Sequence, residues 1–155
     1  MFDIKKFEKI KIEAEKFYQS IGSVYCPYFK EKVHFNSLGL EHLKFKRREK
    51  TRSIQDQYMR MKLLHFAPKI LAQSNTLQGR LDMKSFEKVR INNRTEHMLK
   101  GVTYYEFFAI IEMVRIKIVV REVFGQEKIF WSIIPYWRYS KNRQRKMYHG
   151  NPKED

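Results

Sequence analysis

The strongest constraint on the fold is a regular alternation of side chains late in the chain. In VRIKIVVRE, residues 114–122, Val or Ile occupies every second position, and Arg115, Lys117 and Arg121 lie between them. Successive residues of a strand point to opposite faces of a sheet. The pattern therefore predicts a strand with one apolar face and one face that carries these three cations, named here the cationic face.

A second strand is predicted directly after this one. The apolar run KIFWSIIPYW, residues 128–137, follows the turn sequence FGQE. In that turn Gly125 can supply the positive φ that a type II′ turn requires at its first central position. Strands paired through such a turn place Val119 opposite Ser132. Ser132 is therefore predicted on the cationic face.

The position of Ser132 depends on the register of these two strands. The same pairing sets Arg121 opposite Phe130 and leaves Ser132 diagonal to Arg121 and Lys117. A shift of one residue would put Trp131 on the cationic face in place of Ser132.

The first half of the chain predicts helices. Amphipathic spacing indicates a helix over residues 3–21 that ends near Gly22. Asn36 or Ser37 can cap a short second helix. Residues 53–73 return to helical spacing, and Pro68 should kink that helix or open a new one because proline lacks a backbone donor.

The remaining segments predict strands and loops. Extended segments are expected at residues 24–29 and 32–36, and an exposed basic loop at 44–52. Residues 79–101 predict strand-like pieces broken by polar residues, and three better strands are expected at 102–112, 114–123 and 128–137. We predict an α+β fold in which N-terminal helices pack on a C-terminal antiparallel sheet of about four strands. A single domain over residues 1–138 is expected, followed by a basic tail, residues 139–155, that is disordered or helical.

The charge of the chain indicates its partner class. The sequence has 32 Lys and Arg against 17 Asp and Glu, a formal net charge of +15, which produces a field that attracts polyanions such as nucleic acid. Membrane insertion is not expected, because Glu112, Arg115 and Lys117 interrupt the most apolar region. A charged start without a secretory signal and a single cysteine, Cys26, favour a cytoplasmic location.

Known metal and cofactor motifs are missing from the sequence. The five histidines have no pair spaced as ligands on one helical turn, no glycine-rich phosphate loop occurs, and Ser132 is not in a G-x-S-x-G motif. We expect neither a metal nor a cofactor. RNA can be cleaved without metal through its 2′-OH if a site supplies a base, an acid and fixed positive charge.

Four residues are predicted to be catalytic. A histidine near its unperturbed pKa of about 6.5 can carry protons at neutral pH. His42 is the favoured proton carrier, since it adjoins the densest cluster of cations, although a packed histidine with no role fits equally well. Arg121 and Ser132 share the cationic face, whose alternative interpretation is the solvated face of an ordinary strand. Glu106 is either a general base or the ion-pair partner of Arg121.

Basic and aromatic residues are predicted to contact nucleic acid. These contacts are predicted at Lys44, Lys46, Arg47, Arg48, Arg115, Lys117, Tyr136, Trp137, Arg138, Lys141, Arg143 and Arg145.

Three short motifs occur in an order that is similar to a known superfamily. VHFNSLGLEHLKFKRR (33–48) has a V-x-F strand before G-x-x-H-L and a basic run; RMKLLHFAPKIL (60–71) and KIFWSIIPYWR (128–138) follow. This order, over roughly residues 32–138, resembles phage-associated members of the barnase, EndoU, colicin and RelE-like (BECR) nuclease superfamily.

The resemblance implies N-terminal helices on an antiparallel sheet, RNA cleavage without metal, and for several members a toxin role in bacterial conflict. It makes His42 the acid-base histidine, Arg121 and the basic residues beside His42 the phosphate contacts, and Ser132 the hydroxyl of the late strand.

The leading hypothesis is a metal-independent endoribonuclease that acts on RNA, including ribosome-associated mRNA or tRNA. His42 would transfer protons, and Arg121, Lys117 and Arg47 would stabilise the phosphorane. One alternative is a non-catalytic basic protein that binds RNA or DNA. Another is an interaction module whose positive surface meets an acidic antitoxin or other partner protein.

Overall fold

A computed structural model describes residues 3–47, 50–135, 137–139, 145–147 and 151–155; for Arg47, 137–139 and 145–147 it describes the backbone alone. The elements in chain order are α1 (Ile4–Ile21), β1 (Ser23–Cys26), β2 (Glu31–His34), α2 (Ser37–Lys44), β3 (Phe45–Arg47), β4 (Lys50–Thr51), α3 (Ile54–Leu63), the 3₁₀ helix η1 (Leu64–Phe66), α4 (Ala67–Ala72), β5 (Gly79–Ile91), β6 (Arg94–Ile111), β7 (Val114–Val123), β8 (Ile129–Pro135), β9 (Trp137–Tyr139) and β10 (Arg145–Met147). None of the helices in these ranges has the length and apolar character needed to cross a membrane.

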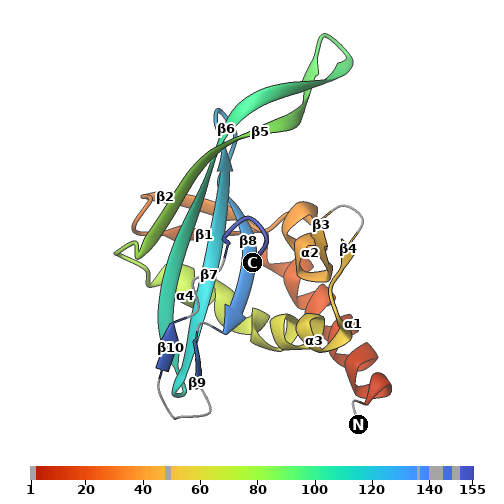
Figure 1. Cartoon of the computed structure of the whole chain (residues 1–155), viewed down its shortest axis with the longest axis vertical. Coiled ribbons are helices and arrows are strands. Elements are labelled where there is room, and N and C mark those ends of the chain that lie inside the picture. The colour runs from red at the N-terminus through yellow and green to blue at the C-terminus, as the bar shows by residue number, and fades with distance from the viewer. Residues whose placement is uncertain (1–2, 48–49, 136, 140–144, 148–150) are drawn as a thin grey trace.

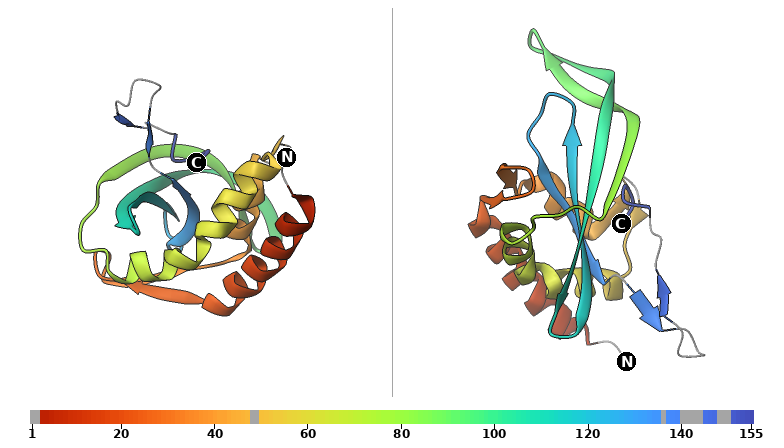
Figure 2. Two further views of the ribbon diagram at one scale, coloured as in Figure 1. Left: turned by 90° about the horizontal axis from the view of Figure 1, so that it is seen from below. Right: turned by 90° about the vertical axis from the view of Figure 1, so that its left-hand side faces the viewer.

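Six strands form one curled sheet in the order β1-β2-β8-β7-β6-β5. All neighbours are antiparallel except β2 and β8, whose parallel pairing is made at His34 and Ile129. The helices gather along one side of the sheet, and the hairpin β5–β6 extends well beyond the other strands (Figure 1, Figure 2). The predicted α+β class is confirmed. The predicted number of about four strands is wrong, because β1 and β2 join the sheet and residues 79–91 form one continuous strand.

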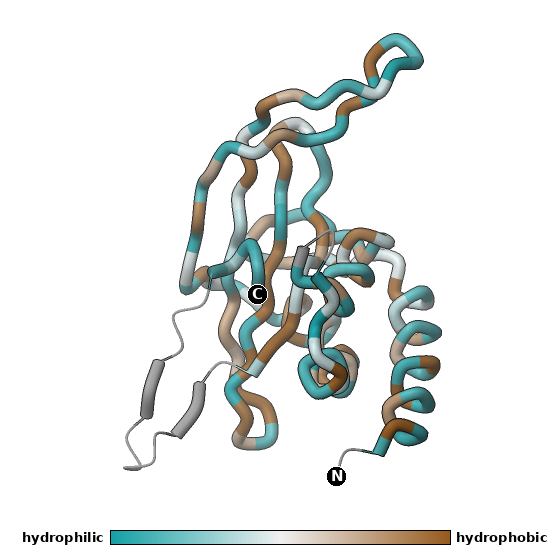
Figure 3. The backbone as a smooth tube through the Cα atoms, turned by 45° about the vertical axis from the view of Figure 1, so that its right-hand side comes forward, coloured by the Kyte–Doolittle hydropathy of each residue, from teal (hydrophilic) through white to brown (hydrophobic). Residues whose placement is uncertain are grey.

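The helices begin and end where the sequence predicts. In α1 the Asp3 side chain caps the first turn by accepting from the backbone N–H groups of Lys5 and Lys6 at 3.0 and 3.3 Å. Hydrophobic and hydrophilic residues alternate along α1 (Figure 3), and its buried side chains include Phe7 and Tyr18. Asn36 caps α2, and a new helix, α4, begins at Ala67 with Pro68 in its first turn.

The two faces of the sheet bury different residues. One face packs on the helices and contributes Tyr105, Phe107, Ile116, Ile118, Val120, Phe130 and Ile133 to the main core. The opposite face has a smaller cluster made of Val102, Tyr104, Val119 and Val123, against which Trp131 packs. The cationic face of β7 therefore looks away from the main core but is itself partly covered.

A β-bulge in β8 sets the side chains near this smaller cluster. Val119 pairs with Ser132 as predicted, but Val120 pairs with Phe130 and Arg121 with Ile129, so Trp131 is an extra residue in the ladder. The predicted pairing of Arg121 with Phe130 is wrong. The bulge lets Trp131 and Ser132 both lie on the face opposite the main core.

The turn that joins β7 to β8 also differs from the prediction. The Gln126 backbone N–H donates to the Val123 oxygen at 2.8 Å, so Gly125, with φ of 82°, is the second central residue of this turn and not the first. A type II′ turn has its positive φ at the first central position, and the prediction of that turn type is therefore wrong.

Hairpin β5–β6 turns sharply at Asn92 and Asn93, whose φ values of 47° and 65° match the two positive angles of a type I′ turn. The polar residues here predicted strand-like pieces, but residues 79–91 and 94–106 pair continuously, so the prediction of broken pieces is wrong. Phe86 and Leu99 are partners across its exposed face, with 71% and 54% of their surfaces accessible.

Gly39 fixes how closely α2 approaches β8, and so how His42 is presented. A Cβ atom at Gly39 would lie 2.3 Å from the Phe130 backbone oxygen and 2.5 Å from the Tyr18 hydroxyl. We expect Gly39→Ala to lower the free energy of unfolding by about 1–3 kcal/mol through overpacking. Chemical denaturation measures this loss. Gly101→Ala is the control, since its nearest neighbour would be 4.0 Å away, and an equal loss in both variants would contradict the prediction.

Candidate functional site: a buried polar cluster and its pocket

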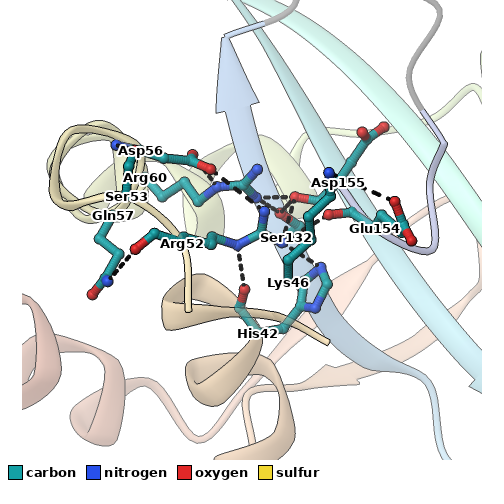
Figure 4. Close-up of polar contacts among 10 residues, drawn as sticks. All are labelled: His42, Lys46, Arg52, Ser53, Asp56, Gln57, Arg60, Ser132, Glu154 and Asp155. Atoms are coloured by element: carbon teal, nitrogen blue, oxygen red, sulfur yellow. Dashed lines mark hydrogen bonds and ion pairs between the residues drawn. The ribbon is translucent and has the colours of Figure 1, made fainter. Parts of the chain in front are cut away.

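The candidate site lies where α2 and α3 pack beside β8, on the side of the sheet opposite the main core. Both helices contact β8, and the pairing of β2 with β8 is confined to one residue pair in the described part of the chain. His42 comes from α2, Arg52 precedes the cap of α3, and Arg60 lies within α3. The Ser132 side chain of β8 lies beside these residues and contacts Arg60 (Figure 4).

Two arginines and Ser132 converge on oxygens of one short segment, Asn151–Asp155. Ser132 Oγ donates to the backbone oxygen of Asp155 at 2.5 Å, and Arg60 Nη1 donates both to that oxygen and, at 2.5 Å, to Ser132 Oγ. Arg52 Nη2 donates to the backbone oxygens of Glu154 and Asp155 at 2.8 and 3.3 Å. Arg52, Arg60, Lys117 and Ser132 are named here the polar cluster, and all four are buried, as is Asp155, which they bind.

Lys117 completes the polar cluster from β7. Its side chain is 0% exposed, and its Nζ lies 2.8 Å from Glu106 Oε2 and 2.5 Å from Asp155 Oδ2. Burial favours the neutral amine, but the hydrogen bonds to Asp155 and Glu106 outweigh it and raise the pKa of Lys117 above its usual value. Lys117 is therefore a permanent cation held between two carboxylates.

Asp155 shows the opposite balance. Burial raises the pKa of the Asp155 carboxyl above its ordinary value, and the charge and hydrogen bond of Lys117 offset only part of that effect. Contacts with Lys117 and Arg60 therefore favour the charged form of the buried Asp155 carboxyl, which burial alone disfavours.

His42 is buried and neutral. Its ring stacks on Trp131 with centroids 4.0 Å apart, and its Nε2 lies 3.0 Å from Arg52 Nη2. A guanidinium only donates, so Nε2 is the acceptor and the ring proton is on Nδ1. Burial, followed by the charges of Arg52, Arg60 and Arg121, lowers the pKa of His42 to about 2. The expected imidazole that titrates near neutral pH is not what this structure describes.

Arg52 has a shifted pKa as well. Burial and the neighbouring charge of Arg60 lower the pKa of the Arg52 guanidinium to about 10, although Asp56 and Asp155 act in the opposite direction. Asp56 also accepts from Arg60 Nε at 2.7 Å, which ties both arginines to α3. Arg52 remains charged at neutral pH but gives up its proton more easily than an ordinary arginine.

Arg121 lies beside the polar cluster and not within it. Its guanidinium carbon is 4.9 Å from the centre of the Trp131 ring, its Nε donates to the Tyr104 hydroxyl at 3.2 Å, and it forms an ion pair with Glu87. The suggested ion pair of Glu106 with Arg121 is therefore wrong, since Glu106 pairs with Lys117. Trp131 is enclosed between His42 and Arg121.

A pocket lies next to the polar cluster, and its lining includes His42 and Glu154, which contact Arg52. It has a volume of about 550 Å³ and is lined by Leu38, Glu41, His42, Phe45, Lys46, Tyr104, Arg121, Trp131, Lys153 and Glu154. Lys46 Nζ lies 3.7 Å from Glu154 Oε2, so the segment that touches the polar cluster also forms one wall of the pocket.

The predicted site residues divide into three groups. His42, Lys46, Glu106, Lys117, Arg121 and Ser132 lie in or next to the pocket and the polar cluster. Lys44 pairs with Glu15 of α1 at 2.5 Å and does not join the site. Arg115 lies two residues before Lys117 on β7, where its backbone pairs with Ile110 of β6. The side chains of Arg47, Arg48, Tyr136, Trp137, Arg138, Lys141, Arg143 and Arg145 lie outside the described residues.

Four residues of the site were not predicted from the sequence: Arg52, Arg60, Glu154 and Asp155. Arg60 lies on a helix whose apolar spacing indicated a different buried face, and Arg52 was assigned to an exposed loop. One available signal was Asp56, which is four residues before Arg60 on α3 and pairs with both arginines. The tail was expected to be disordered or helical, but β9 pairs with β10 and Asn151–Asp155 packs on the polar cluster.

Among the residues that the structure describes, no group of three or more His, Cys, Asp or Glu side chains is arranged to hold a metal ion. Comparison of the chain with protein-family models, with curated proteins and with solved structures gives no match.

Proposed function

We propose that this protein is a metal-independent endoribonuclease of the cytoplasm, with a RelE-like (BECR) fold and an active site at the polar cluster. The observation that carries the proposal is the convergence of Arg52, Arg60 and Ser132 on one backbone oxygen, with Lys117 on the carboxylate of the same residue. Fixed donors aimed at one set of oxygens are the arrangement that stabilises a phosphorane. The net charge of +15 favours a polyanionic substrate.

The proposed reaction starts with a scissile phosphate among Arg60, Lys117 and Ser132. The 2′-oxygen of the preceding nucleotide attacks phosphorus, its proton passes to Nε2 of His42, and the 5′-oxygen leaves with a proton from Arg52. A 2′,3′-cyclic phosphate and a free 5′-OH result. His42 is neutral, which is the form that a base requires, but a pKa of about 2 makes it a weak base while Arg52 donates to its Nε2, so the proton transfer requires that hydrogen bond to break. The lowered pKa of Arg52 favours its role as the acid.

A non-catalytic nucleic-acid-binding protein is the second candidate function. The observation that favours it is the hydrogen bond from Arg52 to Nε2 of His42, since that nitrogen would have to accept the 2′ proton. In this function the same cations contribute electrostatic affinity alone.

Incubation of the protein with RNA in excess EDTA tests the two functions against each other. We expect cleavage that yields 2′,3′-cyclic phosphate ends, and we expect Arg60→Gln to slow it by about 10²–10³-fold because a phosphorane donor is lost. Lys62→Gln is the matched control, since it removes one charge from the exposed side of α3 and should change the rate by less than about threefold. Intact RNA with salt-sensitive binding, both for the full chain and for a chain without residues 151–155, would reject the enzyme and support the binding protein.

A further inference from the structure

The segment Asn151–Asp155 occupies the place that the proposed function gives to a phosphate. Arg52, Arg60 and Ser132 all donate to its backbone oxygens, and Lys117 binds the Asp155 carboxylate. Further out, Trp131 Nε1 donates to the Lys153 oxygen at 3.0 Å. Carbonyl and carboxylate oxygens are the same kind of acceptor as the non-bridging oxygens of a phosphodiester. The segment and a nucleic-acid phosphate therefore cannot use these donors at the same time.

The segment has an ordered local structure of its own. The backbone N–H groups of Glu154 and Asp155 donate to the Asn151 oxygen at 2.9 and 2.8 Å, and the Lys153 N–H donates to Asn151 Oδ1 at 3.2 Å. Pro152, whose ring fixes φ, is buried. These bonds close a compact turn that presents the Asp155 oxygens to the polar cluster with little further loss of conformational entropy.

If the segment leaves, each cation of the polar cluster still has a carboxylate partner. Lys117 keeps Glu106 at 2.8 Å, Arg60 keeps Asp56 at 2.7 Å, and Arg52 keeps Asp56 at 3.5 Å. A buried charge that lost every partner would be costly, but here the retained carboxylates limit the cost of opening. The N–H groups that had donated to Asp155 and Glu154 are then available to another anion.

We propose that Asn151–Asp155 is an autoinhibitory segment, which competes in the same molecule with nucleic-acid phosphate for Arg52, Arg60, Lys117 and Ser132. This inference rests on the proposed function for the identity of the competing anion. The protein with the segment in place is the inhibited form. Binding of RNA at the polar cluster requires the segment to leave.

Removal of residues 151–155 tests this competition directly. The probe is a fluorescent single-stranded RNA oligonucleotide with 2′-O-methyl groups throughout, which cannot be cleaved through its 2′-oxygen, and the readout is fluorescence anisotropy. We expect the truncated protein to bind with a Kd lower by about tenfold or more. Added acetylated peptide of sequence NPKED should weaken RNA binding by the truncated protein and leave the full chain unchanged. Equal or weaker binding by a truncated protein with a cooperative thermal transition would overturn the proposal.

A full-length variant gives a second test that does not depend on the truncated chain folding. Glu154→Gln with Asp155→Asn removes the side-chain ion pairs to Lys46 and Lys117, whereas Glu8→Gln with Glu13→Gln makes the same change of net charge on exposed positions of α1. We expect tighter RNA binding for the first variant than for the second by about threefold or more, and equal affinities would overturn autoinhibition.

Cleavage separates this inference from the proposed function. If ordinary RNA stays intact with the full and truncated proteins while truncation tightens binding, the segment is autoinhibitory and the nuclease activity is rejected. If the full chain cleaves RNA and truncation changes neither the Kd nor the rate, the nuclease stands and autoinhibition is rejected.

Discussion

Replacement of Lys117 with methionine is expected to lower the free energy of unfolding by about 3–5 kcal/mol. Lys117 is 0% exposed, and its amine is the shared partner of the Glu106 and Asp155 carboxylates. Methionine fills a similar volume but removes the cation that lies between the Glu106 and Asp155 carboxylates. Desolvation and mutual repulsion of these charges produce the loss, which urea denaturation at pH 7 measures.

Two comparisons test this cause. Lys117→Met combined with Glu106→Gln and Asp155→Asn removes all three charges, and we expect it to recover a substantial part of the stability. Lys88→Met is the control on an exposed position of β5 and should change stability by less than about 0.5 kcal/mol. A loss below about 1 kcal/mol for Lys117→Met, or no recovery in the triple variant, would show that the ion pairs contribute little.

His42 is expected to make the protein less stable in acid. The folded protein keeps His42 neutral down to about pH 2, whereas the unfolded chain protonates it near pH 6.5. The unfolded state therefore binds more protons between these values, and the free energy of unfolding falls as the pH falls. From pH 6.5 to pH 4.5 the contribution of this residue amounts to about 2 kcal/mol.

The variant His42→Gln isolates this contribution, because glutamine can still accept from Arg52 but does not titrate. We expect its stability to fall less than that of the wild type between pH 6.5 and 4.5, by the same amount of about 2 kcal/mol. His65→Gln changes an exposed histidine and should keep the wild-type dependence on pH. Parallel curves for the wild type and His42→Gln would mean that the imidazole is protonated in the folded protein as readily as in the unfolded chain.

Local patterns in the sequence predicted much of the fold. The helical spacing of α1, the cap at Asn36 and the break at Pro68 each depend on a few neighbouring residues, and all three were predicted correctly. The extent of the sheet depends on long-range pairing. The parallel contact of His34 with Ile129 joins residues far apart in the chain, and no periodicity within either strand signals it.

The candidate site was predicted in part for the same reason. Alternation placed Lys117 and Ser132 on one face correctly, but it could not tell a solvated face from one that α2, α3 and a distant segment cover. The pKa of His42 was expected to be ordinary, since the three arginines that lower it lie at positions 52, 60 and 121. Arg60 was hidden because one charged residue on an amphipathic helix looks like any other exposed residue.

The bulge at Trp131 changes which residues of β8 point to each face of the sheet. On the turn side of Trp131, Val120 pairs with Phe130. Beyond Trp131, Val119 pairs with Ser132, so the register of β7 and β8 shifts by one residue at the bulge. Without the bulge, the register on the turn side would pair Val119 with Trp131 and turn the Ser132 hydroxyl toward the main core. The extra residue in β8 is therefore what directs this hydroxyl to the polar cluster.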